Sequence, residues 1–316
     1  MDRSSYLNHV AILNEELVCA LGCTEPIAVA LAAALATRTL GQRPERLRVA
    51  CSGNIIKNVK SVTVPNSGGM RGIEAAAALG AMGGDPDGSL EVLQSVSEQD
   101  RRDARSLVEE GRCEVELAEG VPNLYVRVVA LGQGHESAAC IEERHTNVCE
   151  LSLDGVATGM ATTSGGPDEE ADERPAADRS ALSLRSVWDF AHELELSDVD
   201  ELISGQIETN QTISKAGLEG RWGANIGSTL LASRPNDISC KARATAAAGS
   251  DARMSGCPLP VTICCGSGNQ GITCSQPVLE YAHELWSDHE TLVRAVALSD
   301  LVAVHVKYFI GELSAF

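Results

Sequence analysis

Residues 21–36 read LGCTEPIAVALAAALA, and this stretch sets the first expectation for the fold. Gly22 ends the segment before it, and Thr24 can cap a helix that follows. The run from Ile27 to Ala36 is apolar and Ala-rich, and it is too short to cross a bilayer. We therefore predict a buried helix over residues 24–39 that packs closely against other small side chains.

Helical patterns also flank this stretch and return near the end of the chain. Apolar residues at three- and four-residue spacing predict a helix over residues 4–21, and an Ala-rich helix is expected over residues 72–82. From Ser183 onward the pattern is again helical. The last helix opens with a capping-box sequence over residues 287–290. An apolar stripe follows it, which we expect to be exposed for want of a packing partner: Leu292, Val296, Ser299, Ala303, Val306 and Ile310.

Strand patterns occupy the middle of the chain. From Cys113 the apolar period changes to two and continues to Leu153, where Asp154-Gly155 marks a turn. A short strand is also expected over residues 47–51. The sequence predicts an α+β protein with a predominantly helical, Ala/Gly-rich core and a small, mainly antiparallel β-sheet inserted in the middle.

Four parts follow from these patterns. Residues 1–110 form an N-terminal helical part, and residues 111–158 form the small antiparallel β part. Residues 159–182 are rich in Gly, Ser, Pro, Asp and Glu and predict a flexible acidic linker. Residues 183–316 form a C-terminal helical part.

Charge and cysteine usage limit the partners. The chain has 25 Lys and Arg residues and 44 Asp and Glu residues, so its formal net charge is 25 − 44 = −19. So negative a charge argues against nucleic acid and against anionic membranes as partners. The first residues do not resemble a secretory leader, so we expect a cytoplasmic protein. Its 11 cysteines are then expected to be reduced thiols, most of them buried.

Cys23 has two interpretations from the residues alone. It lies between a helix stop and a helix start, where unpaired N–H groups and the positive end of the helix dipole favour a thiolate. Iron, zinc and nucleophilic mechanisms all require that form. The alternative is a buried cysteine in a tight turn between helices. A metal-free thiol enzyme would require Cys23 to lie beside His145.

The segment Ser52–Asn58 and the loop Pro65–Gly69 suit an anion. Glycines before a helix let backbone N–H groups converge on a carboxylate or phosphate, with Lys57 as a countercharge. The nucleotide-binding glycine motifs are absent from the sequence. A purely structural turn is the alternative.

Two further polar segments suggest a site. In Arg144-His145-Thr146-Asn147, the histidine is either a base or a structural residue between two strands. The loop Cys264–Gly271 is too polar to be core without partners, so we expect it to contact a ligand. Cys257 and Cys274 are the nearest further cysteines, and the spacing gives only weak support for a closed zinc site.

Six short segments of the chain together resemble one family. They are LGCTEP (21–26), GNIIKN (53–58), VPNSGG (64–69), RHTN (144–147), SDARM (250–254) and GSGNQG (266–271). In this order they resemble the bacterial and archaeal L-cysteine desulfidases, which are related to the alpha chain of iron–sulfur L-serine dehydratases. The resemblance extends over nearly the whole chain.

The resemblance implies a lyase of cysteine catabolism. L-cysteine would give sulfide, ammonia and pyruvate, or L-serine would give ammonia and pyruvate. A [4Fe-4S] cluster held by three cysteines would leave one iron open to the substrate, and no pyridoxal phosphate is needed. On this basis Cys23 is a cluster ligand, and His145 and Lys57 are catalytic candidates. The predicted substrate-binding residues are Asn54, Asn58, Ser67, Gly68, Gly69, Thr146, Asn147, Ser267, Asn269 and Gln270.

One departure from the family pattern limits this prediction. A segment like Leu313–Ala315 is followed in the family by a cysteine and then by a further segment with the third ligand. We therefore expect a C-terminally truncated member that is inactive unless a second polypeptide, or a homo-oligomer, completes it. The alternative is a non-catalytic remnant or an amino-acid-binding subunit without the cluster. The sequence does not separate L-cysteine from L-serine.

Overall fold

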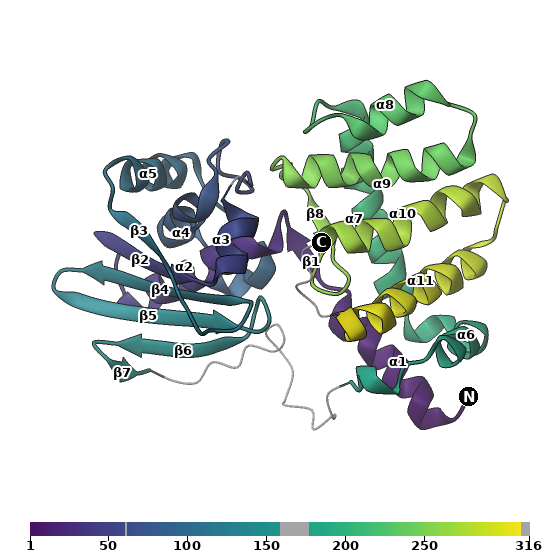
Figure 1. Ribbon diagram of the computed structural model, residues 1–316, viewed down its shortest axis with the longest axis horizontal. Helices are drawn as coiled ribbons and strands as arrows, with labels where there is room; N and C mark the ends of the chain where they lie inside the picture. The colour runs from purple at the N-terminus through teal and green to yellow at the C-terminus, as the bar shows by residue number, and fades with distance from the viewer. Residues whose placement is uncertain (61, 159–176, 311–316) are drawn as a thin grey trace. The chain divides into compact units, whose positions relative to one another are not determined.

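The computed structural model describes residues 1–60, 62–158 and 177–310 (Figure 1). These residues form two compact units: unit 1 contains residues 1–20 and 177–310, and unit 2 contains residues 21–60 and 62–158. Residues 159–176, which form most of the predicted acidic linker, lie outside the described residues, as does the terminal Leu313–Ala315 segment.

Unit 2 is built on a six-stranded sheet with the strand order β3-β2-β4-β5-β6-β7 (Figure 1). β2 pairs in parallel with β3 and antiparallel with β4, and the later pairs are antiparallel. The predicted α+β class with a mainly antiparallel sheet is therefore confirmed. The strands are β2 (Arg46–Cys51), β3 (Cys113–Leu117), β4 (Tyr125–Gly132), β5 (His135–Glu142), β6 (Val148–Leu153) and β7 (Val156–Ala157).

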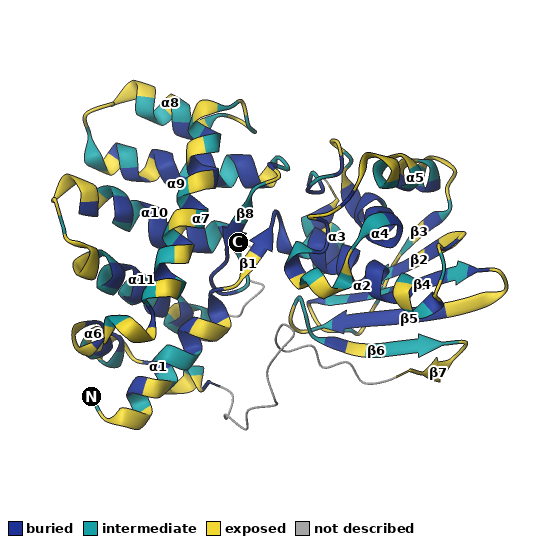
Figure 2. Cartoon of the chain, turned by 180° about the vertical axis from the view of Figure 1, so that it is seen from behind, coloured by how far each residue is buried: buried dark blue, intermediate teal, exposed yellow. Residues whose placement is uncertain are grey.

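Helix α2 (Thr24–Leu40) is the central helix of unit 2. It packs against α4 (Gly72–Gly83) and against strands β4 and β5. Residues 27–36 are each at most 3% exposed, so the prediction of a buried Ala-rich helix is confirmed, and β5 is buried along most of its length (Figure 2). A Cβ on Gly80 would lie 2.2 Å from the carbonyl oxygen of Ala30, which shows how closely the two helices approach. The other helices are α3 (Gly53–Val59), η1 (Pro86–Glu91) and α5 (Glu98–Glu109).

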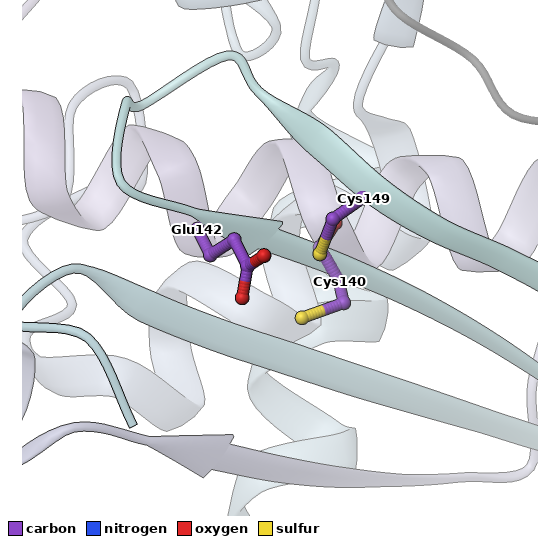
Figure 3. Close-up of side chains that lie close together, drawn as sticks. All are labelled: Cys140, Glu142 and Cys149. Atoms are coloured by element: carbon purple, nitrogen blue, oxygen red, sulfur yellow. The ribbon is translucent and has the colours of Figure 1, made fainter. Parts of the chain in front are cut away.

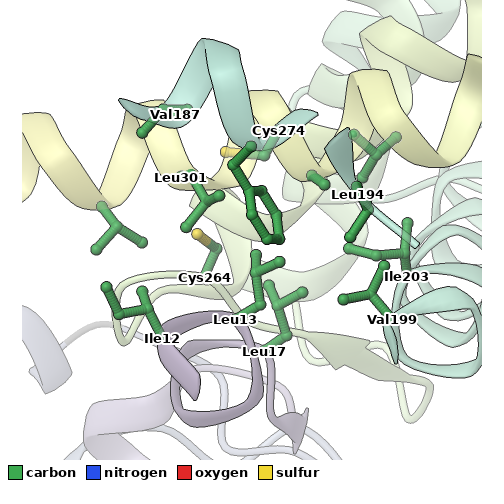
Figure 4. Packing of buried hydrophobic residues seen from close by; sticks show 14 of the residues in the cluster. Ile12, Leu13, Leu17, Val187, Leu194, Val199, Ile203, Cys264, Cys274 and Leu301 are labelled. Carbon is green, nitrogen blue, oxygen red and sulfur yellow. The ribbon is translucent and has the colours of Figure 1, made fainter. Parts of the chain in front are cut away.

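Unit 1 is almost entirely helical. Its core gathers side chains from α1, α6, α7, α10 and α11 (Figure 4). Phe190 is fully buried and lies beside His9, at a ring-centroid distance of 5.1 Å. A small two-stranded sheet joins β1 and β8. The elements are α1 (Arg3–Glu16), β1 (Cys19–Leu21), η2 (Arg179–Ala181), α6 (Leu184–Glu193), η3 (Leu196–Asp198), α7 (Asp200–Glu219), α8 (Ile226–Ser233), α9 (Ile238–Met254), β8 (Pro260–Thr262), α10 (Gly268–Glu284) and α11 (His289–Ile310).

The first helix is shorter than its apolar spacing predicts. It ends at Glu16, and residues 19–21 form strand β1, because an extended chain can pair with β8. The amide of Ile263 donates a hydrogen bond to the carbonyl of Val18 at 2.8 Å. The predicted cap of the second helix also moves by one residue, because Cys23 is the N-cap and Thr24 is the first helical residue. At residues 19–21, pairing with β8 therefore outweighs the helical spacing of the apolar residues.

The last helix is present as α11 (His289–Ile310), but its predicted cap is wrong. The Thr291 amide donates to Asp288 Oδ1 at 2.9 Å, so Asp288 takes the capping role expected of Ser287. Of the predicted apolar stripe, only Val296 is buried, and Val306 and Ile310 are exposed. The side chains that α11 buries are Val293, Val296, Ala297, Asp300, Leu301 and Val304.

No helix among the described residues has both the length and the apolarity needed to cross a membrane.

Candidate active site

Cys23 lies where strand β1 leads into helix α2. Gly22, between the two elements, has φ +70°, a left-handed conformation that glycine adopts without steric cost. Cys23 is the N-cap of α2 and is 5% exposed. Its thiol donates a hydrogen bond to Glu25 Oε2 at 3.0 Å. The thiol is therefore at a helix N-terminus, as the sequence predicts, and it is already oriented by a carboxylate.

Glu25 connects the first motif to the second. Its Oε2 also accepts from Thr24 Oγ1 at 3.3 Å, and its Oε1 accepts from Asn58 Nδ2 at 3.3 Å. The structure therefore brings together two predicted site residues, Cys23 and Asn58, through a residue to which the sequence assigned no role. The only signal in the sequence was a carboxylate two residues after the cysteine.

Gly22 connects the first motif to the third. A Cβ on Gly22 would lie 2.0 Å from Pro65 Cγ, well inside any allowed contact. Gly22 thus serves both the left-handed turn and the close approach of the loop that begins at Pro65. The second and third motifs, which both lie more than 25 residues after the first in the sequence, therefore meet it around the start of α2.

The loop of residues 62–72 is closed at its base by a bridge between Thr63 and Arg71. Ser67 is 1% exposed, and its hydroxyl donates to the carbonyl of Met70 at 3.2 Å. This hydroxyl therefore supports the loop, so the donors left for a ligand at the tip are backbone groups.

The tip of this loop presents two backbone donors. Gly68 and Gly69 are exposed and have φ values of +68° and +91°. Neither N–H group has a hydrogen-bond partner within the part of the chain that the structure describes. Successive free N–H groups in such a conformation suit a carboxylate.

Two arginines of α5 lie beside the tip. A Cβ on Gly68 would lie 3.8 Å from Arg101 Cδ and 3.8 Å from Arg105 Nη2. The Arg101 side chain is occupied, since its Nε donates to the carbonyl of Asn66 at 2.6 Å. Arg105 is exposed and forms no ion pair with any described residue. Arg105 could not be identified from the sequence, because nothing in the pattern of α5 points to a loop more than 30 residues earlier.

The remaining residues of the second motif lie on α3. Ser52 caps this helix by accepting from the Ile55 amide at 3.4 Å. Lys57 is exposed and, within the described residues, forms no ion pair, while Asn54 is half-buried. Lys57 is thus a free cation on the helix that contributes Asn58 to the Glu25 network.

His145 and Thr146 lie in the loop between β5 and β6, both half-buried. Asn147 closes this loop, because its Nδ2 donates to the carbonyl of Glu142 at 3.0 Å and its own carbonyl accepts from the Glu142 amide at 3.1 Å. The roles predicted for these three residues stay predictions.

Ser267, Asn269 and Gln270 belong to unit 1, at the start of α10. Ser267 is the N-cap and accepts from the Gln270 amide at 3.4 Å. Asn269 Oδ1 accepts from Arg253 Nη1 at 3.1 Å, and Gln270 Nε2 donates to Cys274 Sγ at 3.6 Å. All three side chains therefore take part in the local structure of the loop, and their contact with a ligand stays a prediction.

One group of potential metal ligands in unit 2 lies on the sheet: Cys140, Glu142 and Cys149, with their ligand atoms within 4.8 Å of one another (Figure 3). The pairing of β5 with β6 shifts register between Cys140 and Ile141, and such a shift re-aims a side chain. Burial raises the pKa of both thiols, and for Cys149 a hydrogen bond with Cys140 opposes this effect. The structure therefore adds a small thiol–carboxylate cluster that the sequence analysis did not single out.

Comparison with known proteins identifies the family. The profile of the serine dehydratase alpha chain family matches residues 87–316. The chain belongs to the serine dehydratase alpha chain family. A UPF0597 protein of Finegoldia magna is 44% identical over 312 residues, covering 98% of this chain and 73% of that protein. UPF0597 proteins of Desulfitobacterium hafniense and Chromobacterium violaceum are 44% and 39% identical, and each match covers 71% of the relative. The comparison with solved structures gives no match.

The serine dehydratase alpha chain family implies an iron–sulfur cluster, and the described residues allow a partial test of the fit. Cys23 offers a thiol at a helix N-terminus, where a thiolate is stabilised. The three-ligand group described within unit 2 does not include Cys23. A four-iron cluster needs several thiolates. The described residues of unit 2 therefore fit one ligand position and not a complete cluster site.

Proposed function

We propose that this chain takes part in an iron–sulfur-dependent β-elimination on a small amino acid. The substrate is L-cysteine, giving sulfide, ammonia and pyruvate, or L-serine, giving ammonia and pyruvate. The observation that carries the proposal is the meeting of three segments around Cys23, through the Glu25–Asn58 hydrogen bond and the Gly22–Pro65 contact. Residues brought together from distant segments in this way are typical of a site.

The substrate carboxylate binds at the loop tip. The free N–H groups of Gly68 and Gly69 supply two donors, and the Arg105 guanidinium supplies the countercharge. Lys57 adds a second cation. Charge-assisted hydrogen bonds of this kind are about twice as strong as neutral ones. They therefore hold the amino acid by its carboxylate, a group that L-cysteine and L-serine share.

Cys23 and Glu25 form the reacting end of the site. Glu25 Oε2 accepts the Cys23 thiol proton in the hydrogen bond at 3.0 Å, and it is placed to take up that proton when the thiol ionises. Cys23 is then the one cluster ligand that this chain supplies from unit 2. The other thiolates come from a further polypeptide segment.

His145 is the proposed base for the Cα proton. Thr146, Asn147 and Asn54 contribute polar contacts in unit 2. An imidazole is suited to this step because it accepts a proton near neutral pH.

A second candidate function is amino-acid binding without catalysis. The exposed Gly68–Gly69 tip and the Arg105 side chain beside it favour this function, because they can bind a carboxylate without a cluster. In that case the Gly68–Gly69 tip and Arg105 would still bind a carboxylate, and no pyruvate would form.

Anaerobic reconstitution tests the two candidates. The chain is incubated with iron and sulfide, alone and together with the part of the Finegoldia magna relative that lies outside the match. Cluster absorption, and pyruvate from L-cysteine and L-serine, are then measured. The lyase proposal predicts pyruvate when the second polypeptide is present. Saturable amino-acid binding by calorimetry with no pyruvate in either mixture would support the second candidate, and neither binding nor pyruvate would overturn both.

A further inference from the structure

A second thiol–carboxylate group lies in unit 1, outside the residues assigned to the proposed reaction. It contains Cys264, in the loop after β8, Cys274 on α10 and Asp300 on α11. One ligand atom from each residue lies within 4.8 Å of the other two. With Zn–S bonds of about 2.3 Å, tetrahedral thiolates lie roughly 3.8 Å apart. The three ligand atoms therefore lie within a range that one metal ion can span.

The three residues are closed off from solvent. Cys264, Cys274 and Asp300 are 0%, 4% and 0% exposed. Both sulfurs lie among the apolar side chains of the unit 1 core, close to Leu301 (Figure 4). A dry, fully enclosed group of this kind is typical of a structural metal site, whereas a catalytic site keeps an open position.

Asp300 is a fully buried carboxylate in an otherwise mainly apolar core, and apolar packing alone does not account for it. Its Oδ1 accepts from Gln206 Nε2 at 3.0 Å, but its Oδ2 has no hydrogen-bond partner among the described residues. Asp300 also forms no ion pair within the described part of the chain. Because an unpaired buried carboxylate is costly, such groups bind a metal ion or keep a proton.

The choice of metal follows from the donors. Two thiolates and one carboxylate oxygen suit a soft or borderline divalent ion such as zinc and do not suit magnesium or calcium. Cys265 is the nearest further donor, with its Sγ 3.5 Å from Cys264 Sγ. Cys265 also holds a left-handed backbone conformation, φ +52°, in the turn that Cys264 and Ser267 close.

We propose that Cys264, Cys274 and Asp300 bind one zinc-class divalent ion that ties the loop after β8 to helices α10 and α11. The ion replaces the thiol protons and the carboxyl proton and pairs with the free Oδ2 of Asp300. By fixing Cys264, it also fixes the turn that leads to Ser267 and the start of α10.

Cobalt substitution of the full chain tests the site. The chain is stripped with a chelator under reducing conditions and titrated with Co²⁺, and the thiolate-to-cobalt charge-transfer and d–d bands are recorded. We expect one cobalt per chain in the wild type and in Cys140→Ser, a control that removes a sulfur from the group on the unit 2 sheet. Cys274→Ser and Asp300→Asn should weaken binding by roughly 10- to 100-fold or more. Cys240→Ser, a buried cysteine of α9, should bind as the wild type does.

X-ray absorption at the zinc edge covers the case in which a ligand variant does not fold. In Cys140→Ser loaded with zinc, the proposal predicts at least two sulfur neighbours at about 2.3 Å. Cobalt bands that vanish in Cys140→Ser but persist in Cys274→Ser would overturn the proposal. Zinc bound by nitrogen and oxygen alone, or no bound metal in the wild type, would also overturn it.

Discussion

The two cysteine-containing sites, Cys23 in unit 2 and Cys264 in unit 1, are assembled in opposite ways. Cys23 and its carboxylate are two residues apart in the sequence, and the loop that packs on Gly22 ends in free N–H groups. Cys264 depends on Cys274 and Asp300 from two other elements, and all three are enclosed by apolar side chains. A site with exposed donors can meet a small molecule, whereas a closed one can only stabilise the fold.

Among the substitutions proposed for stability, Gly22→Ala, at the contact with Pro65, should have the largest effect. Gly22→Ala adds a Cβ that would lie 2.0 Å from Pro65 Cγ at φ +70°. We expect it to lower the free energy of unfolding by about 2–4 kcal/mol, measured by urea denaturation. Gly41→Ala is the matched control at the other end of α2, with φ +74° and nothing within 4 Å, and should lower it by only about 1–2 kcal/mol. Equal losses would show that the Pro65 loop does not pack tightly on Gly22.

The Glu25 network is expected to affect activity more than stability. Glu25→Gln keeps the size of the side chain but removes the negative charge of the carboxylate that accepts the Cys23 hydrogen bond. In the reconstituted system the rate of pyruvate formation should fall by roughly 10- to 100-fold. Glu74→Gln, in the first turn of α4, is the control and should leave the rate near that of the wild type. A normal rate with Glu25→Gln would indicate that Cys23 has only a structural role, as we propose for Cys264.

Arg105 tests whether the exposed tip binds the substrate. Arg105→Ala removes the free guanidinium beside Gly68, so KM for the amino acid should rise about fivefold, equivalent to roughly 1 kcal/mol, with kcat unchanged. Arg102→Ala, which removes an arginine that contacts Gln99 on the same helix, is the control. A KM that responds equally to both variants would indicate general surface charge and no specific site.

The cap of α5 should give the smallest effect. Ser97 and Asp100 form a capping box, and the hydrogen bond from Ser97 holds the Asp100 pKa below its usual value of 3.8. Because the folded pKa is lowered, this contribution is present above about pH 4 and is lost as the pH falls through the folded pKa. Ser97→Ala should cost about 0.5–1 kcal/mol of unfolding free energy at neutral pH. Denaturation at several pH values checks this, and a difference that does not shrink toward pH 3 would contradict the assignment.

Much of the fold follows from local patterns. The buried helix from Ile27 to Ala36 and the strands from Cys113 onward were predictable, because each depends on apolar spacing within one element. The end of α1 was not, because β1 forms only by pairing with β8, which lies more than 200 residues away in the sequence. The stripe predicted to be exposed on α11 is exposed at Val306 and Ile310 but buried at Val296, because the packing partners of this helix cannot be read from its own pattern.

The candidate site divides in the same way. Cys23 and the Gly68–Gly69 tip were identified from short motifs, because each depends on neighbouring residues. Glu25 was visible but unassigned, because its bond to Asn58 exists only in the folded chain. Arg105 and Asp300 carried no local signal, since a charged residue on an amphipathic helix is normally a solvated one.

The most direct test of the central claim compares Cys23→Ser with Cys240→Ser in the reconstituted system. Both substitutions replace a buried thiol by a hydroxyl, but only Cys23 is proposed to take part in the reaction. Pyruvate formation from L-cysteine and L-serine is measured for each. We expect the rate of Cys23→Ser to fall roughly 100-fold or more below that of the wild type, while Cys240→Ser retains the wild-type rate. Equal rates for the two variants would contradict the assignment of Cys23 to the reacting site.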